Sequence, residues 1–130
     1  MSESANVTVV RRFYEHLASP GVLMQVLSPT IRWEITPGFP HGGDYAGVET
    51  VFRDFFGRVL ADFDDWCTVM SEVHDAGDRV LALGTYSGRA KTTGKTFVAR
   101  FSHCWTVERG TMVRLQQCAD TAQISRALEA

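Results

Sequence analysis

KTFVARFSHCWTVERGTMVRLQQCADTAQ, residues 95–123, is the stretch that decides the fold. β-Branched and aromatic residues fill both sides of the short polar break Glu108-Arg109-Gly110, which predicts two strands joined by a tight turn. Because successive side chains alternate along a strand, Phe101, His103 and Trp105 share one face of the first strand. One histidine therefore lies in an otherwise apolar row.

The second strand of this hairpin also mixes polar and apolar side chains. Leu115 and Gln117 share one face by alternation, and Cys118 and Asp120 share the other. Polar groups that face an apolar wall are typical of a small-molecule pocket. An ordinary hydrogen-bonded core contains them too, so the rest of the chain has to decide between the two.

Length and composition predict a single globular domain over residues 1–130, since 45% hydrophobic content in 130 residues supports one core and leaves no room for a second. The net charge is −2 and no block of Lys or Arg occurs, which argues against nucleic acid and anionic membrane as partners. No run approaches the roughly 18 apolar residues of a membrane-spanning helix. The beginning, MSESANVTVV, lacks an export signal, so we expect a cytoplasmic protein.

The cysteines and histidines give no sign of a metal or cofactor site. The three cysteines are odd in number and lack CxxC spacing, so they are expected to be buried free thiols: Cys67, Cys104 and Cys118. The histidines outside the hairpin have no metal-ligand spacing with any Cys, Asp or Glu. The sequence therefore predicts no metal and no cofactor.

Helices are predicted in the first half of the chain. With Ser4 as its cap, the first helix carries an apolar stripe to Leu17 and ends at Ser19-Pro20-Gly21. A short second helix runs from Pro20 to about residue 27, and a third runs over about 48–63 with a broad aromatic stripe. Tyr14 is the only polar-tipped residue on the first stripe, so its hydroxyl either bonds within the fold or faces a cavity.

Strands fill most of the remainder. Residues 31–36 alternate as a strand with one covered face, whereas PGFPHGGDYAG (37–47) is expected to be an irregular surface loop, functional or merely connecting. Strands at about 66–75, 79–91, 95–108 and 111–120 are separated by short turns and therefore form an antiparallel meander. Residues 121–129 are a weaker candidate for a terminal helix. The fold class is α+β, with helices on one face of a strongly curved sheet.

This order of elements resembles the nuclear transport factor 2-like superfamily over the whole chain, especially its SnoaL-like and ketosteroid-isomerase-like branches. The segments that carry the resemblance are VVRRFYEHLAS, IRWEITPG, GGDYAG, VETVFRDFF and FSHCWTVERGTMVRLQQCADTAQI. The resemblance implies a cystatin-like α+β roll, in which a cone-shaped, curved antiparallel sheet covered by three helices encloses a mostly apolar cavity.

The steroid isomerase branch implies roles for particular residues. There, a tyrosine on the first helix and an acid on the penultimate strand hold a developing oxyanion. Tyr14 and His103 fall close to these two positions. The general base of that branch is expected around Thr36, where no side chain can abstract a carbon-bound proton, and Glu34 lies on the face opposite Trp33.

The SnoaL-like cyclase branch implies an aspartate on the last strand as the acid or base. Asp120 matches that position, with Gln117 as an orienting group, provided that a bulge or strand end near Cys118 turns Asp120 inward. The related limonene-epoxide-hydrolase-like enzymes need an Asp-Arg-Asp set, which Arg100 and Asp120 match only in part. The expected catalytic residues are thus Asp120, His103 and Tyr14.

A carboxylate beside His103 would favour the protonated imidazole, which can stabilise or protonate an enolate. The alternative is that His103 is a hydrogen-bonded wall residue without a catalytic role. The expected substrate-binding residues are Trp33, Phe55, Tyr86, Phe101, Trp105 and Gln117.

Two function classes fit these residues. The first is a cofactor-independent enzyme, isomerase-like or polyketide-cyclase-like, that acts by acid/base chemistry (isomerisation, cyclisation or hydration) on a small apolar carbonyl or polycyclic molecule. The second is a non-catalytic protein that binds such a molecule in the same cavity. A carboxylate that points into the cavity favours the enzyme, and an Asp120 that faces solvent or caps a helix favours binding.

A homodimer is the expected assembly. The outer sheet face is too apolar for exposure, and such patches usually mark interfaces. The residues expected on it are Leu81, Leu83, Cys104 and Cys118.

Overall fold

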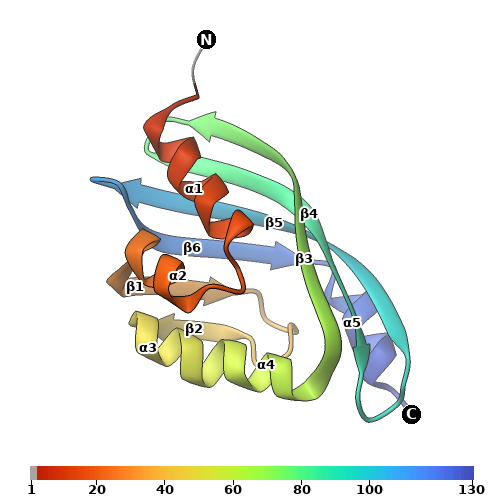
Figure 1. Cartoon of the computed structure of the whole chain (residues 1–130). Coiled ribbons are helices and arrows are strands. Elements are labelled where there is room, and N and C mark those ends of the chain that lie inside the picture. Colours follow the sequence, from red (N-terminus) through yellow and green to blue (C-terminus); the bar gives the residue numbers. More distant parts are fainter. Residues whose placement is uncertain (1–2) are drawn as a thin grey trace.

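The predicted hairpin lies within a six-stranded, strongly curved sheet in the computed structural model, which describes residues 3–130 (Figure 1). The strand order is β2-β1-β6-β5-β4-β3. The strands are β1 (Leu27–Ile35), β2 (Gly43–Ala46), β3 (Phe63–Ala76), β4 (Arg79–Ala90), β5 (Thr96–Glu108) and β6 (Thr111–Ala119). Neighbours are antiparallel except β1 and β6, which are parallel and close the predicted meander against the first half of the chain.

Helices cover one face of this sheet (Figure 1). They are α1 (Ala5–Glu15), α2 (Pro20–Val26) and a composite helix made of α3 (Val48–Thr50), η1 (Val51–Phe56) and α4 (Gly57–Asp62). A further helix, α5 (Thr121–Leu128), packs against β5 and β4 near the C-terminus. The α+β architecture of a curved sheet with covering helices is therefore confirmed, and the terminal helix is present.

Local signals account for the first helix and the last hairpin. The Ser4 hydroxyl accepts a hydrogen bond from the Val7 N–H at 3.2 Å, which is the expected N-terminal cap. In the β5–β6 turn, Arg109 and Gly110 both have positive φ angles, 52° and 77°. A two-residue turn of this kind matches the right-handed twist of the flanking strands, and glycine adopts it without strain.

The predicted faces of the hairpin are correct for the residues named on β5 and β6. Phe101, His103 and Trp105 are all buried, as alternation requires, and so are Leu115 and Gln117. Alternation fails only at the start of β6, where Thr106 pairs with Arg114 and Val107 with Met112. Val113 is therefore an extra residue of β6, a β-bulge.

The prediction of an irregular loop over 37–47 is wrong for its last part. Gly43–Ala46 forms β2, which pairs antiparallel with the end of β1. Both prolines of this stretch lie before β2, so they take no donor from its ladder.

The third predicted helix is present, but its middle, η1, is a wider π-helical turn. The Gly57 N–H bonds to the Phe52 carbonyl, five residues back. This extra residue per turn brings Phe52, Phe55 and Phe56 to the inner side of the helix, where all three line a cavity.

The prediction of buried thiols is also wrong. Cys67 and Cys118 are exposed and Cys104 is half-buried, and all three are free. Cys104 and Cys118 lie on the outward side of β5 and β6, which no helix shields at those positions. Within residues 3–130, no helix is long and apolar enough to cross a membrane.

Candidate functional site

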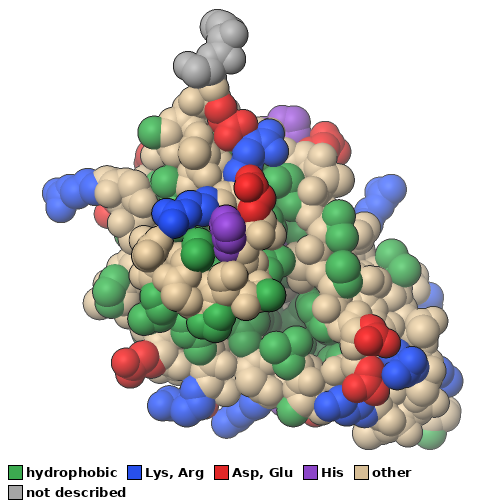
Figure 2. Space-filling model, in the orientation of Figure 1, with side chains coloured by type: hydrophobic (Ala, Val, Ile, Leu, Met, Phe, Trp, Pro, Cys, Tyr) green, Lys and Arg blue, Asp and Glu red, His purple; other side chains and the backbone are tan. Residues whose placement is uncertain are grey.

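A cavity of about 550 Å³ lies between the helices and the sheet. Figure 2 shows hydrophobic side chains gathered around a hollow on this face of the molecule. A large part of its wall is aromatic, and the Phe and Trp side chains in it are Phe13, Trp33, Phe39, Phe52, Phe55, Phe56 and Trp66. Neither a carboxylate nor a Lys or Arg is among the described lining residues, so the cavity suits an uncharged molecule.

One polar cluster interrupts this wall, and His103 on β5 is its centre. The Tyr14 hydroxyl, from α1, lies 2.5 Å from His103 Nδ1, and the Tyr86 hydroxyl, from β4, lies 2.6 Å from His103 Nε2. The three side chains come from three different elements and meet only in the folded chain. His103 is 4% exposed, so these two hydroxyls replace water as its partners.

A second set of hydrogen bonds orients the two tyrosines. Trp105 Nε1 donates to the Tyr14 oxygen at 2.9 Å, and Gln117 Nε2 donates to the Tyr86 oxygen at 2.8 Å. The backbone N–H of Thr36 in turn donates to Gln117 Oε1 at 3.4 Å. The cluster thus reaches from α1 to the end of β1, and its geometry is held by both helix and sheet.

Phe101 fixes the plane of the imidazole. Its ring stacks on His103 with centroids 4.0 Å apart and on Tyr86 with centroids 4.5 Å apart. Phe101 pairs across the strands with Gly84, where a Cβ would lie only 2.6 Å from the phenyl ring. Glycine is therefore required at this point of β4 for the aromatic stack to form.

All three titratable groups of the cluster are neutral near pH 7. Burial lowers the pKa of His103 to about 3, because the charged imidazolium loses its hydration. Burial raises the pKa of Tyr14 well above its ordinary value, against a smaller lowering by the bond from Trp105, and burial raises the pKa of Tyr86 also. The expected protonated imidazole beside a carboxylate is not what the structure contains.

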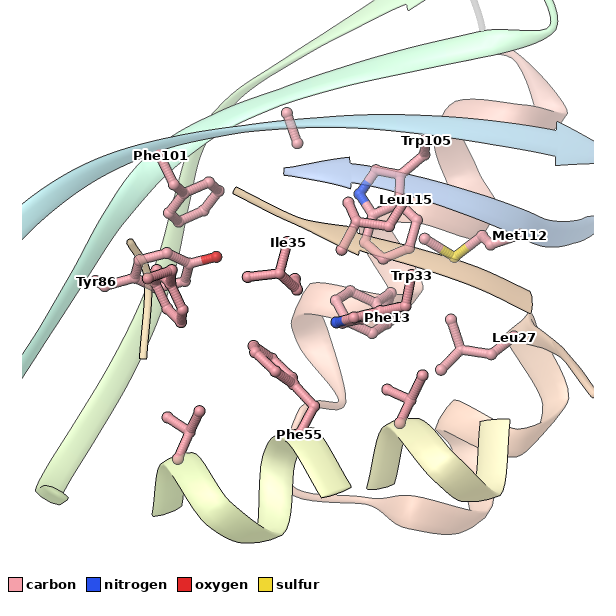
Figure 3. Packing of buried hydrophobic residues seen from close by; sticks show 14 of the residues in the cluster. Phe13, Leu27, Trp33, Ile35, Phe55, Tyr86, Phe101, Trp105, Met112 and Leu115 are labelled. Carbon is pink, nitrogen blue, oxygen red and sulfur yellow. The ribbon is translucent and has the colours of Figure 1, made fainter. Parts of the chain in front are cut away.

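Most of the predicted site residues meet at this cavity. Trp33, Phe55, Tyr86, His103 and Gln117 line it. Tyr14, Phe101 and Trp105 lie behind the wall, where they contact His103 instead of the open space. Figure 3 shows Trp105, Trp33 and Phe13 close together on one side of the interior, with Tyr86 and Phe101 on the other.

Asp120 lies away from the cavity, so the expectation that its carboxylate turns inward is wrong. The carboxylate is exposed and does not line the cavity. Strand β6 ends at Ala119, as anticipated, but the chain then turns outward into α5, with Asp120 at the N-cap position and its backbone N–H bonded to the Arg100 carbonyl. A catalytic role for Asp120 remains a prediction that the cavity geometry does not favour.

Glu34 is held on the opposite face of the sheet, as alternation predicted. Arg114 binds it with two hydrogen bonds, of 2.6 and 3.0 Å. This bidentate contact lowers the pKa of the Glu34 carboxyl. Glu34 is therefore an ion-pair partner on the outer surface and does not supply a base to the cavity.

Several lining residues were missed by the sequence analysis. Phe39, from the loop before β2, packs against Phe55, Trp66 and Tyr86 with centroid distances of 5.6 to 6.0 Å. An aromatic residue between two prolines and two glycines was the available signal, because such a residue seldom faces solvent without a function. Trp66 carried no such signal, because the irregularity beside it, between Asp64 and Cys67, arises only in the pairing of β3 with β4.

Metal-binding groups are absent from the described residues: nowhere in 3–130 do three or more His, Cys, Asp or Glu side chains lie together as a metal ion would need.

Comparisons with known proteins agree with this geometry. The family described as SnoaL-like domain matches residues 10–115. An NTF2-like protein from Burkholderia thailandensis is 30% identical, with a TM-score of 0.92, over 99% of this chain and 100% of that one.

Two more distant structures share the fold. TerC, co-crystallised with polyporic acid, is 22% identical with a TM-score of 0.85, over 98% of this chain and 100% of that one. A putative SnoaL-like polyketide cyclase from Jannaschia sp. is 18% identical with a TM-score of 0.83, over 100% of this chain and 98% of that one. A search of curated proteins gives no significant match.

Proposed function

The chain belongs to the SnoaL-like domain family, and from that premise we propose that its cavity binds a small, uncharged, mostly apolar molecule that carries a hydrogen-bonding oxygen. The observation that supports this most is the contrast within the wall. Aromatic and aliphatic carbon surrounds about 550 Å³, and the polar side chains among the described lining residues are uncharged. Cavities of this size and composition hold drug-sized molecules.

The absence of charge from the described lining residues decides the ligand class. An ammonium or carboxylate ligand would lose its hydration and gain no partner of opposite charge. A neutral polycyclic or carbonyl-bearing molecule loses little hydration and gains contact with the aromatic rings. TerC, which shares this fold, was co-crystallised with polyporic acid, and this supports a small organic ligand for the cavity here as well.

Catalysis is the second candidate. Tyr86, His103 and Tyr14 form a chain of neutral hydrogen-bonding groups that can polarise a substrate carbonyl, as isomerisation, cyclisation or hydration without a cofactor requires. These three side chains include no carboxylate that could remove a proton from carbon. Binding without turnover is thus the function that this geometry favours, with carbonyl polarisation as the chemistry available to an enzyme.

Fluorescence titration with fluorene, an uncharged tricyclic hydrocarbon, tests the binding function. Trp33 and Trp66 line the cavity, so their emission should change as it fills. Val59→Phe places a ring inside the cavity and should weaken binding at least tenfold. Val98→Phe makes the same change on a side chain that is 65% exposed and should leave binding unaltered. Equal affinity for all three proteins would place the ligand outside the cavity and end the proposal.

Deuterium exchange separates an enzyme from a binding protein. In D2O, a protein that polarises a carbonyl and removes the neighbouring proton would accelerate exchange at C2 of 1-tetralone. We expect binding of 1-tetralone without accelerated exchange. Exchange that is lost in Tyr86→Phe would instead establish the catalytic candidate.

A further inference from the structure

The hydrogens of the polar cluster can be counted, and one is left over. Neutral His103 carries one ring hydrogen, and Tyr14 and Tyr86 carry one hydroxyl hydrogen each. Two contacts join these groups, Tyr14 to Nδ1 and Tyr86 to Nε2, and each contact uses one hydrogen. Three hydrogens therefore serve two bonds, and one tyrosine hydrogen remains free to donate elsewhere.

The tautomer of His103 decides which tyrosine has the free hydrogen. If Nε2 carries the ring hydrogen, Nδ1 accepts from Tyr14 and the Tyr86 hydrogen is free. If Nδ1 carries it, Nε2 accepts from Tyr86 and the Tyr14 hydrogen is free. The two forms have the same heavy-atom positions, so the surroundings of the two hydroxyls distinguish them.

No described protein group can take the free hydrogen in either form. The other neighbour of the Tyr14 oxygen is the Trp105 N–H, which is a donor. The other neighbour of the Tyr86 oxygen is the Gln117 amide, whose NH2 end faces Tyr86 because its oxygen accepts from the Thr36 N–H. The remaining acceptor must come from outside the described chain.

Only one of the two tyrosines is a lining residue of the cavity. Tyr86 lines it and Tyr14 does not. In Figure 3 the Tyr86 hydroxyl points from its strand into the interior, toward Ile35. A free hydrogen on Tyr14 would be enclosed by protein without a partner, whereas one on Tyr86 meets a space that a ligand can fill.

A second donor in the same wall is also unpartnered. Trp33 is 3% exposed and lines the cavity, and its Nε1–H is buried without a hydrogen-bond partner. Native proteins rarely leave such a group unpaired. The wall thus has two donors without an acceptor, which indicates a ligand that supplies acceptors.

We propose, on the basis of the binding function above, that the cavity recognises a carbonyl oxygen of its ligand through the hydroxyl hydrogen of Tyr86, and that binding holds His103 in the tautomer with its hydrogen on Nε2. The ligand class is an uncharged aromatic or polycyclic ketone. Trp33 Nε1 is the donor for a second acceptor oxygen. Protonated amines are disfavoured, since an ammonium group has no lone pair for the Tyr86 hydrogen and finds no carboxylate among the described lining residues.

Three molecules of one skeleton test this preference: fluorene, 9-fluorenone and 9-aminofluorene. Fluorenone should bind about tenfold more tightly than fluorene, because it adds one hydrogen bond to a donor that has no other partner. Protonated 9-aminofluorene should bind more weakly than either. In Tyr86→Phe the ratio of the fluorenone affinity to the fluorene affinity should fall to about one. Tyr45→Phe removes a hydroxyl that bonds the His41 carbonyl outside the lining residues and should keep the advantage.

NMR of the wild-type protein gives a readout that needs no variant. With fluorenone bound, the ¹⁵N shifts of His103 should show a neutral ring with hydrogen on Nε2 and a bare Nδ1. The ¹³C signal of the labelled carbonyl should move downfield, as hydrogen bonding requires. A hydrogen on Nδ1 in the complex would overturn the proposal. So would a carbonyl ¹³C chemical shift of bound fluorenone equal to that of fluorenone dissolved in an apolar solvent.

The outcomes separate this inference from the function on which it rests. If fluorene and fluorenone bind with equal affinity, the cavity binds ligands but Tyr86 does not recognise a carbonyl, so only the inference fails. If neither molecule binds, the binding function fails, and the inference fails with it.

Discussion

His103 shows how strongly a single environment can change a residue's chemistry. Its place in an apolar row made it a candidate acid, charged by a neighbouring carboxylate. The fold instead surrounds it with two hydroxyls and the Phe101 ring, and no carboxylate contacts it. In this structure His103 is a neutral link between the two tyrosine hydroxyls, and its catalytic role stays a prediction.

Acid titration should reveal this neutral histidine. The unfolded chain binds a proton at His103 below its ordinary pKa of 6.5, whereas the folded chain does so only near pH 3. Between these values each unit of falling pH should lower the free energy of unfolding by about 1.4 kcal/mol through this group alone. Urea denaturation at pH 7, 6, 5 and 4 should show a free energy of unfolding that falls with pH more steeply in the wild type than in His103→Gln. Equal slopes would mean that folded His103 is protonated.

Gly84 is a second residue whose identity is set by one neighbour. A Cβ there would lie 2.0 Å from the Val69 carbonyl and 2.6 Å from the Phe101 ring. Gly84→Ala should therefore destabilise the protein by about 1–3 kcal/mol in urea denaturation, as overpacking does. Gly21→Ala, where nothing lies within 4 Å, should be neutral or slightly stabilising in its helix. A tolerated Gly84→Ala would show that the aromatic stack is not tight.

At the scale of elements, the junction between β6 and α5 decides the direction of the Asp120 side chain. One residue earlier, Ala119 still pairs with Phe101, so the strand carries its side chains to the edge of the site. The turn into α5 then directs the next side chain to solvent. Asp120 stands at the N-cap position of α5 without a capping hydrogen bond from its side chain, and Asp and Asn are nearly equivalent at such a position.

Asp120→Asn should consequently leave both stability and ligand affinity unchanged, within about 0.5 kcal/mol for stability. Thermal unfolding and fluorene titration of the variant measure the two effects. Loss of ligand binding or of any turnover with the fold intact would contradict this expectation and support the functional role of Asp120 that the family resemblance implies.

At the scale of the whole molecule, the two faces of the sheet differ in their coverage. Helices and the cavity occupy the inner face, whereas the outer face carries exposed aliphatic side chains. Val69, Leu81 and Val98 are 51%, 40% and 65% exposed, on three adjacent strands. We propose that a second copy of the chain covers this outer face in a homodimer.

Sedimentation velocity at micromolar concentration should therefore give the mass of a dimer. Leu81→Arg should dissociate it, because a charge would be buried at the centre of the contact. Met24→Arg is a matched control, since Met24 is 47% exposed on α2, on the side away from the outer face. A monomeric wild type would refute the dimer.

The sequence by itself determined most of the elements and the faces of the main strands, though not the short strand β2. Alternation located the strands of the meander, the apolar stripes located the helices, and both placed Tyr14 and His103 as polar groups within buried rows. These signals are local, because each depends on the backbone geometry of a few successive residues. The family and the curved α+β fold followed from their order.

The tertiary structure alone decided which polar groups meet. Tyr14, Tyr86, His103 and Gln117 are far apart in sequence, and their contacts depend on the parallel pairing of β1 with β6 and on the register of β4 with β5. A shift of one residue exchanges the two faces of a strand, so spacing could not settle where Asp120 points. The cavity and its unpaired donors are products of long-range packing, which no local pattern encodes.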